Sequence, residues 1–376
     1  MVETGYWFER AEFEARLGRV QATLRAKGYD ALLAFMPESV TWITGYFTRG
    51  YGTFQFAIVP ANGAPTVICR DVEEYYLDST CVFPDRALWS DSDAPLAVAA
   101  EAIRIRLGAS PRLAVELAAW PLSVARYEGL RALLPGAVFH DESRLVTEMR
   151  FVKSPAEVAY QRRAARAAEA GMQAAIDTAR AGKSEREMAA EICAAMIRAG
   201  SDLPGPGVLS SGERAFHLHG GYSDRVLAHG DIVQVETTPN VRHYHARFMR
   251  PIRVGAASAD DFSVVAKLIA IQDRALAEVA PGVAATVPDR IYREGVLAAG
   301  LRESYTNKTF YSVGLMLQPV GGEPLEAAPG AAWRFEPGMV FHTYVLARGF
   351  GMSETILVTD SGHERLTNFP RQLFVS

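Results

Sequence analysis

The chain has few cysteines, no strongly charged stretch and no long apolar run, and each absence excludes a class of protein. Only three of its 376 residues are cysteine. Their odd number and spacing fit neither a disulfide framework nor a zinc site, and they indicate a reducing compartment. The formal net charge of −4 comes without a polybasic run. Nucleic acid and an anionic membrane surface are therefore not expected as partners.

The chain also lacks the segments that carry proteins into or across membranes. No window approaches about 18 uninterrupted apolar residues, so no membrane span is expected. The opening residues, MVETGYWFERAEF, have neither the cationic nor the apolar region of a secretory signal. With 49% apolar and 22% charged residues, the composition is that of a soluble globular protein. We therefore expect a cytoplasmic protein, long enough for two domains.

The first part of the chain alternates between helix and strand patterns. Apolar residues between Phe8 and Lys27 recur at helical spacing, Gly28 can end that helix, and residues 30–35 are typical of a buried strand. Similar alternation continues to Asp141, which indicates a mixed sheet flanked by helices. No glycine-rich phosphate loop follows a strand here, so nucleotide binding is not expected.

A capping box marks the expected domain boundary. Ser154 can cap a helix, Pro155 suits its first turn, and Glu157 completes the box. We therefore predict an α/β domain over residues 1–150 and an α+β domain over residues 151–376. In the second domain helices are followed by a hairpin, further helices and a second set of strands.

The stretch GDIVQVETTPNVRHYHARFMR carries polar side chains in a pattern that points to chemistry. Alternation on both sides of its Thr-Pro-Asn segment predicts a β-hairpin that turns there. Residues two apart share a face of a strand, so His243, His245 and Arg247 are expected to point together. Glu236 lies in the strand before the turn. A carboxylate, imidazoles and a guanidinium on one hairpin predict a functional site.

Several further motifs follow one another in a fixed order. They are KSPAE at 153–157, SG at 211–212, HGDIVQVE ending at 236, EPGMVF at 336–341 and ETILVT at 354–359. In this order they resemble the aminopeptidase P/creatinase superfamily. That resemblance implies a creatinase-like N-terminal domain and a catalytic pita-bread C-terminal domain. It also implies a homodimer in which the partner's N-terminal domain completes the pocket, with Arg49 and Tyr51 as substrate contacts.

The peptidases of this superfamily bind two divalent metals, and the resemblance places their five ligands on substituted positions. The two Asp fall on Glu236 and Arg247, the His on Tyr311, and the two Glu on Tyr344 and Ser353. A guanidinium about 4 Å from a dication would be repelled by roughly 8 kcal/mol at an effective dielectric near 20. We therefore expect neither a metal nor another cofactor.

The chain is more similar to the metal-free branch of the superfamily, creatinase and ectoine hydrolase. Counting from the SG motif places creatinase's histidine on His219, but its two partner carboxylates fall on Met249 and Tyr344. The similarity to ectoine hydrolase covers Glu236, Tyr244-His245, Tyr311, Phe341-His342, Glu354 and the final NFPRQLFV. Its cysteine after Tyr-His is replaced by Ala246, so the substrate or the way it is held has changed.

Hydrolysis of a C–N bond needs one group that activates water or attacks directly and another that protonates the leaving nitrogen. Glu236 is our candidate base or nucleophile, and His219 our candidate proton shuttle, because an imidazole exchanges protons near neutral pH. Arg247 would bind a substrate carboxylate by a forked contact. The remaining substrate-binding candidates are His245, Tyr311, His342, Tyr344 and Glu354.

Other interpretations stay open at this point. Glu236 could be a structural ion-pair partner of Arg247, and His217 competes with His219 for the pocket. The whole protein could be a non-catalytic pita-bread binding module, or an Xaa-Pro-type metallopeptidase with atypical ligands. The substrate is open among creatine, ectoine, a related cyclic amidine and an N-acyl amino acid.

Overall fold

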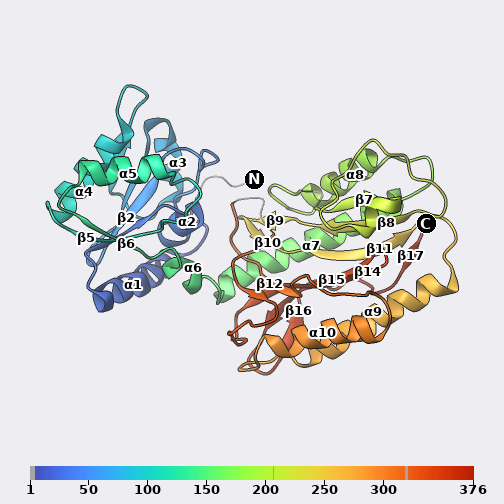
Figure 1. Ribbon diagram of the computed structural model, residues 1–376. Helices are drawn as coiled ribbons and strands as arrows, with labels where there is room; N and C mark the ends of the chain where they lie inside the picture. The colour runs from blue at the N-terminus through green and yellow to red at the C-terminus, as the bar shows by residue number, and fades with distance from the viewer. Residues whose placement is uncertain (1–4, 206, 318–320) are drawn as a thin grey trace. The chain divides into compact units, whose positions relative to one another are not determined.

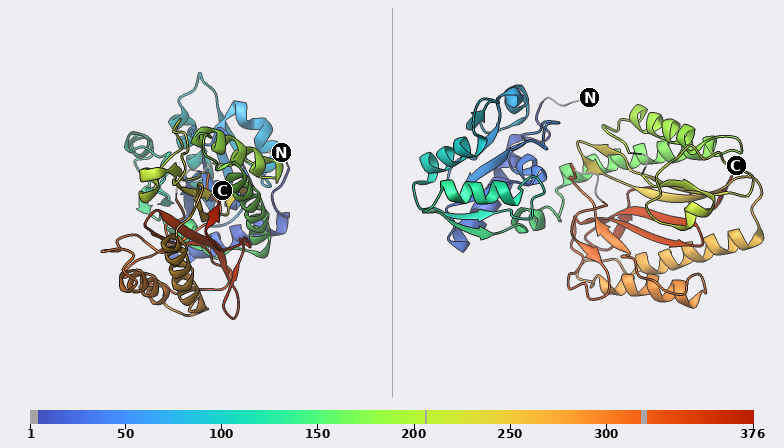
Figure 2. Two further views of the ribbon diagram at one scale, coloured as in Figure 1. Left: turned by 90° about the vertical axis from the view of Figure 1, so that its right-hand side faces the viewer. Right: turned by 45° about the horizontal axis from the view of Figure 1, so that its top comes forward.

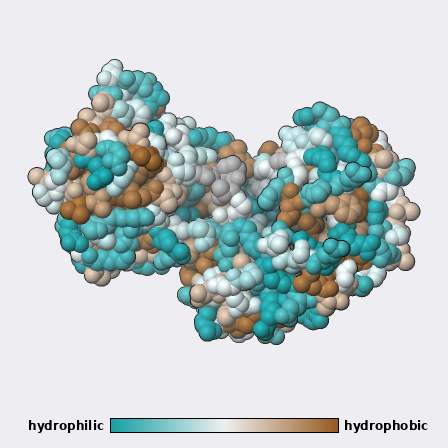
Figure 3. All heavy atoms as spheres, in the orientation of Figure 1, coloured by the Kyte–Doolittle hydropathy of each residue, from teal (hydrophilic) through white to brown (hydrophobic). Residues whose placement is uncertain are grey.

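The computed structural model describes residues 5–205, 207–317 and 321–376 (Figure 1). The chain divides into two compact units, Met1–Met149 and Arg150–Ser376. No helix in the described part is long and apolar enough to cross a membrane. The surface shown in Figure 3 mixes polar and apolar side chains. Cys69, Cys81 and Cys193 are free thiols.

The first unit is built on a six-stranded mixed sheet in the order β4-β3-β2-β1-β5-β6. The strands are β1 Ala31–Ala34, β2 Phe56–Pro60, β3 Thr66–Arg70, β4 Arg86–Trp89, β5 Arg112–Val115 and β6 Val138–Asp141. The helices are α1 Arg10–Lys27, α2 Pro37–Thr44, α3 Glu74–Thr80, α4 Pro95–Leu107, α5 Val124–Leu133 and α6 Leu145–Met149, with a short 3-10 turn at Asp71–Glu73. The expected α/β organisation is confirmed.

Local sequence explains how α1 ends and why two other elements were not predicted. Gly28 ends α1 with a φ of 71°, a conformation that favours glycine. By contrast, α3 and β4 were missed because both are short and lack a periodic pattern: β4 has four residues, of which three are only half-buried.

The second unit contains four α-helices, a short 3-10 turn at Gly212–Phe216 and two larger sheets within the described residues. The helices are α7 Pro155–Thr178, α8 Glu185–Arg198, α9 Ala259–Ala277 and α10 Thr286–Ala298. One sheet, in the order β17-β11-β8-β7, contains β7 Leu209–Ser211, β8 Ile232–Thr237, β11 Phe248–Arg253 and β17 Phe374–Val375. The other, in the order β13-β12-β14-β15-β16, contains β12 Phe310–Ser312, β13 Glu326–Ala327, β14 Val340–Ala347, β15 Phe350–Val358 and β16 His363–Arg365. A small hairpin pairs β9 Asn240–Val241 with β10 Tyr244–His245.

Each sheet of this unit is covered by a pair of helices on one face. The helices α7 and α8 lie along the sheet that contains β8, and α9 and α10 lie along the sheet that contains β14 (Figures 1 and 2). Buried side chains of each pair pack on its sheet. The sheets join where β11 meets β15: Met249 N donates to Ser353 Oγ at 2.6 Å, and Arg250 Nη1 donates to Ser353 O at 2.8 Å. The uncovered faces thereby turn toward one another.

The capping box at the domain boundary begins α7 as the sequence predicts. Ser154 Oγ accepts from Glu157 N at 3.2 Å, and Glu157 Oε2 accepts from Ser154 N at 2.8 Å. The same reciprocal pair forms between Ser184 and Glu187 at the start of α8. These bonds satisfy backbone donors that have no partner inside a helix.

The central hairpin is longer than predicted and turns at a different place. β8 and β11 pair antiparallel, with Glu236 opposite Met249, but β9 and β10 extend the hairpin past the Pro-Asn segment. The chain reverses at Arg242 and His243, whose φ angles are 53° and 58°. His243 therefore belongs to the turn, and the prediction that its side chain points the same way as those of His245 and Arg247 is wrong.

Candidate active site

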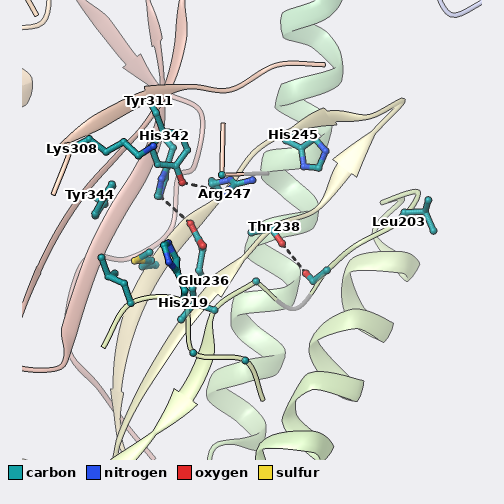
Figure 4. Close-up of a pocket in the computed structure, with 18 residues that line it drawn as sticks. Leu203, His219, Glu236, Thr238, His245, Arg247, Lys308, Tyr311, His342 and Tyr344 are labelled. Carbon is teal, nitrogen blue, oxygen red and sulfur yellow. Dashed lines mark hydrogen bonds and ion pairs between the residues drawn. The ribbon is translucent and has the colours of Figure 1, made fainter. Parts of the chain in front are cut away.

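A cavity of about 590 Å³ lies against the uncovered faces of the two sheets. Glu236 enters it from β8, Tyr311 from β12, and His342 and Tyr344 from β14 (Figure 4). Met249 of β11 also lines it. Two loops complete the lining, around residues 203–208 and 218–221. Because each strand exposes alternate side chains to the cavity, polar groups far apart in sequence converge there.

Glu236 is the carboxylate of this cavity. Its side chain is buried, and Oε1 has no hydrogen-bond partner among the described residues. His342 Nε2 lies 3.5 Å from Oε1. Burial raises the pKa of Glu236, because a low-dielectric surrounding disfavours the charged form, while Arg247 and then His219 pull the pKa back down. The carboxylate is therefore a stronger base than an exposed one.

Two imidazoles in the cavity are held in the neutral form. Burial lowers the pKa of His342 well below its ordinary value, and the Arg247 charge acts in the same direction. Burial also lowers the pKa of His245 to about 3, with further contributions from Arg247 and His243. His245 Nε2 lies 3.1 Å from Met316 O, a bond that assigns the proton to Nε2. The described residues leave His245 Nδ1 and both ring nitrogens of His342 without partners.

Arg247 places a buried guanidinium in the same cavity. Its Nη1 donates to Tyr311 Oη at 3.2 Å, and its backbone is fixed by Thr355 Oγ1 on both sides. Burial alone would lower the pKa of Arg247, but the neighbouring Tyr311 and Glu236 raise it, so the group stays charged. Burial raises the pKa values of Tyr311 and Tyr344, which keep their phenol protons.

The histidine predicted as proton shuttle stands on the loop that follows β7. His219 is exposed, has a φ of 65°, and lines the cavity close to Glu236 (Figure 4). His217 lines a separate pocket beside Phe216 and Arg302. Of the two competing histidines, the structure thus brings His219 to the carboxylate.

Glu354 does not join the cavity, which corrects the expectation that it binds substrate. In the β14–β15 register Glu354 pairs with Thr343, whereas Ser353 pairs with the cavity residue Tyr344. Its carboxylate accepts from Arg250 Nη2 at 2.8 Å and from Thr367 Oγ1 at 2.5 Å, with all three side chains fully buried. Glu354 is part of a structural ion pair.

Arg49 and Tyr51 lie in the first unit. Arg49 is exposed, and the Tyr51 ring lies edge-on to Trp120 with 6.3 Å between centroids. Their predicted contact with a substrate held by a partner subunit stays a prediction.

Two cavity features were missed in the sequence. Lys308 lines the cavity, with Nζ 5.1 Å from the Tyr311 ring centroid and an ion pair to Glu326. It precedes β12 in a loop, where no periodic pattern could place it. Gly207, at a φ of 64°, has no room for a side chain, because an added Cβ would lie 2.0 Å from Glu236 O. Its packing holds the loop against the backbone of β8.

The donor set of the cavity does not fit a pair of divalent metals. Among the described residues no group of three or more His, Cys, Asp or Glu side chains is arranged to hold a metal ion. Divalent ions of this kind need several oxygen or imidazole ligands together. Here the lining offers the carboxylate of Glu236 beside two cationic side chains, Arg247 and Lys308.

Comparison with known proteins gives a consistent picture across both units. Residues 159–360 match the metallopeptidase family M24, and residues 16–152 match the creatinase/prolidase N-terminal domain. Ectoine hydrolase from Halomonas elongata is 26% identical over 100% of both chains. An Xaa-Pro dipeptidase from Pyrococcus horikoshii is 28% identical over 61% of this chain and 66% of its own. The crystal structure of dipeptidase PepE from Mycobacterium ulcerans is similar with a TM-score of 0.83 and 25% identity, covering 98% and 99% of the two chains.

Proposed function

The chain belongs to metallopeptidase family M24, and from this premise we propose that it hydrolyses a C–N bond in a small, carboxylate-bearing nitrogen compound without a metal ion. Membership of the family and its relatives, which include ectoine hydrolase and dipeptidases, make the protein a hydrolase with a pita-bread catalytic domain. The bond, the substrate class and the absence of a metal step are our proposal.

One observation carries it: residues from β8, β10, β14 and the segment before β11 that line one cavity have polar atoms without partners among the described residues. These atoms are Glu236 Oε1, both ring nitrogens of His342, His245 Nδ1 and Arg247 Nε, which lack hydrogen-bond partners within the described ranges. A buried polar atom left unsatisfied costs about 1–3 kcal/mol. A ligand with N–H groups opposite Glu236 Oε1, His245 Nδ1 and the acceptor nitrogen of His342, with an acceptor opposite the His342 N–H and a carboxylate opposite Arg247, would satisfy them together.

The same arrangement supports a two-residue mechanism. Ionised Glu236 removes a proton from water, whose oxygen adds to the carbon of the C–N bond. As that bond breaks, His219 donates a proton to the leaving nitrogen. Glu236 then releases to solvent the proton that it took from water, and His219 takes up a proton from solvent on its exposed loop, which restores both groups. Neutral His342 lies beside this carboxylate, with 3.5 Å between its Nε2 and Glu236 Oε1, and would hydrogen-bond the substrate. Direct attack by Glu236 is the alternative: a covalent intermediate forms as the leaving nitrogen departs, and when water cleaves it at the Glu236 carboxyl carbon, a single turnover in ¹⁸O-labelled water labels the carboxylate.

The test is a substrate screen with the purified protein, with and without EDTA or added Mn²⁺. The compounds are creatine, ectoine, related cyclic amidines, N-acyl amino acids and Xaa-Pro dipeptides. We expect turnover of a carboxylate-bearing non-peptide compound that EDTA leaves unchanged. Glu236→Gln and His219→Ala should each lower kcat about 100-fold or more, because a positioned proton transfer contributes 10²–10⁴.

His217→Ala is the matched control, since His217 lies two residues from His219 but lines another pocket. Full activity in Glu236→Gln or His219→Ala would overturn the mechanism. Cleavage confined to Xaa-Pro dipeptides and dependent on Mn²⁺ would instead establish a metallopeptidase. Tight binding without turnover of any compound would indicate a binding module.

A further inference from the structure

Glu185 is a fully buried carboxylate that lies outside the cavity and has no part in the proposed chemistry. It stands in the first turn of α8 and accepts five hydrogen bonds. Its Oε1 accepts from Ser211 N at 2.8 Å and Ser211 Oγ at 2.7 Å. Its Oε2 accepts from Ser223 N at 2.8 Å, Ser223 Oγ at 2.6 Å and Arg214 Nη1 at 2.7 Å.

These donors come from the two ends of one segment, residues 211–223, which we call the histidine loop because it carries His219. Ser211 is the last residue of β7, and Ser223 ends the loop. Arg214 crosses between its two sides: Nη1 also donates to Ser223 Oγ at 2.9 Å, and Nη2 donates to Gly221 O. One carboxylate therefore closes the loop at its base.

The backbone on both sides strengthens this closure. Glu185 N donates to Arg225 O at 3.0 Å and Arg186 N donates to Ser223 O at 3.1 Å, so donors of the first turn of α8 hold the chain that leaves the loop. Leu209 N donates to Gly220 O at 2.9 Å, directly after His219. These bonds hold His219 at its φ of 65°, a conformation that L residues rarely adopt.

We propose that Glu185 is a positioning residue, which holds the histidine loop so that His219 faces Glu236. This inference rests on the function proposed above. Burial would raise the pKa of Glu185, but the hydrogen bonds from Ser223, Ser211 and Arg214 outweigh it and lower that pKa, so the group is ionised. Both carboxylate oxygens accept, which a neutral amide of the same shape cannot reproduce because its nitrogen is a donor.

The test compares Glu185→Gln with Glu187→Gln in the whole protein. Both glutamates lie in the first turn of α8, but within the described residues the Glu187 carboxylate bonds to Ser184 and Lys183 alone, away from the histidine loop. Hydrogen–deuterium exchange should rise in residues 212–222 of Glu185→Gln and stay at the wild-type level there in Glu187→Gln. With a substrate found in the screen, Glu185→Gln should lower kcat by about tenfold to a hundredfold with little change in KM.

Hydrogen–deuterium exchange tests whether Glu185 holds the histidine loop even if no substrate has been found. A failed substrate screen is therefore distinguishable from a failure of this proposal. Unchanged exchange in the histidine loop of Glu185→Gln would overturn the proposal. So would raised exchange in the loop combined with a kcat no lower than that of Glu187→Gln, because the order of the loop would then not govern His219. If Glu185→Gln does not fold, Ser223→Ala replaces it in both measurements. This substitution removes one hydrogen-bond donor to Glu185 Oε2, and the same outcomes support or overturn the proposal.

Discussion

Two opposing effects set the charge of Glu236. Burial raises the pKa of this carboxyl, and the Arg247 charge lowers it. As pH falls through that raised pKa, Glu236 takes up a proton and can no longer act as a base. Activity should therefore fall on the acidic side at a pH above the ordinary glutamate value of about 4.3.

Replacing Arg247 with methionine should move the acidic limb of the pH–activity profile, where activity is lost as Glu236 is protonated, to higher pH. The reason is that the charge that favours ionised Glu236 is lost. The substitution should also lower kcat/KM roughly 10- to 100-fold, since a hydrogen bond to a charged group contributes about 1.5–3 kcal/mol. The measurement is kcat/KM as a function of pH. Lys308→Met is the control, because Lys308 lines the cavity but is not among the groups that shift Glu236. An acidic limb that stays in place in Arg247→Met would contradict this account.

Neighbouring residues of the β14–β15 hairpin point alternately into the cavity and to the opposite face of the sheet. His342 and Tyr344 point from β14 into the cavity, while Thr343 between them bonds Tyr292 of α10 at 2.9 Å. Ser353 of β15 pairs with Tyr344 and lies on the same face of the sheet, whereas Glu354 pairs with Thr343 and lies on the opposite face. A shift of one residue in this register would exchange the two sets.

Glu354→Gln should destabilise the protein by about 3–5 kcal/mol, because it leaves Arg250 as an uncompensated buried charge. KM should change little, since Glu354 does not line the cavity. Urea unfolding measures the stability loss. Glu364→Gln is the matched control: its pair with Arg162 is more than 40% exposed on both side chains, and its loss should cost less than about 1 kcal/mol. Wild-type stability combined with a raised KM in Glu354→Gln would instead indicate that Glu354 binds the substrate.

The whole molecule has the two-domain organisation expected from the sequence: a creatinase-like N-terminal domain and a pita-bread domain. We predict that it works as a homodimer in which Arg49 and Tyr51 reach the partner's cavity. A homodimer with shared sites contains two equivalent composite pockets related by its symmetry.

Mixing two inactive variants tests this arrangement. Arg49→Ala and Glu236→Gln should each be nearly inactive, but in a mixed dimer one cavity has both intact residues. Re-equilibrated equimolar mixtures should therefore recover about a quarter of wild-type activity, since half the dimers are mixed and each has one working site. Sedimentation checks that dimers form. No recovery from a mixture that does exchange subunits would show that each pocket is complete within one chain.

Much of the fold followed from short-range patterns. Capping boxes begin α7 and α8, helical spacing defines α1, and Gly28 ends it. Each depends on residues within a few positions of one another, so the sequence is sufficient to predict it. The family motifs then identified the candidate site, because their order along the chain is specific even where single residues are substituted.

The sequence by itself determined the two domains and the polar residues of the central hairpin. Only the tertiary structure decided that Glu354 faces away from the cavity, that Lys308 lines it, and that His219 rather than His217 approaches Glu236. Periodicity and capping act over one or two turns of chain. Which faces meet depends on the junction of β11 with β15 and on the closure of a loop by a distant carboxylate, and no local pattern records either.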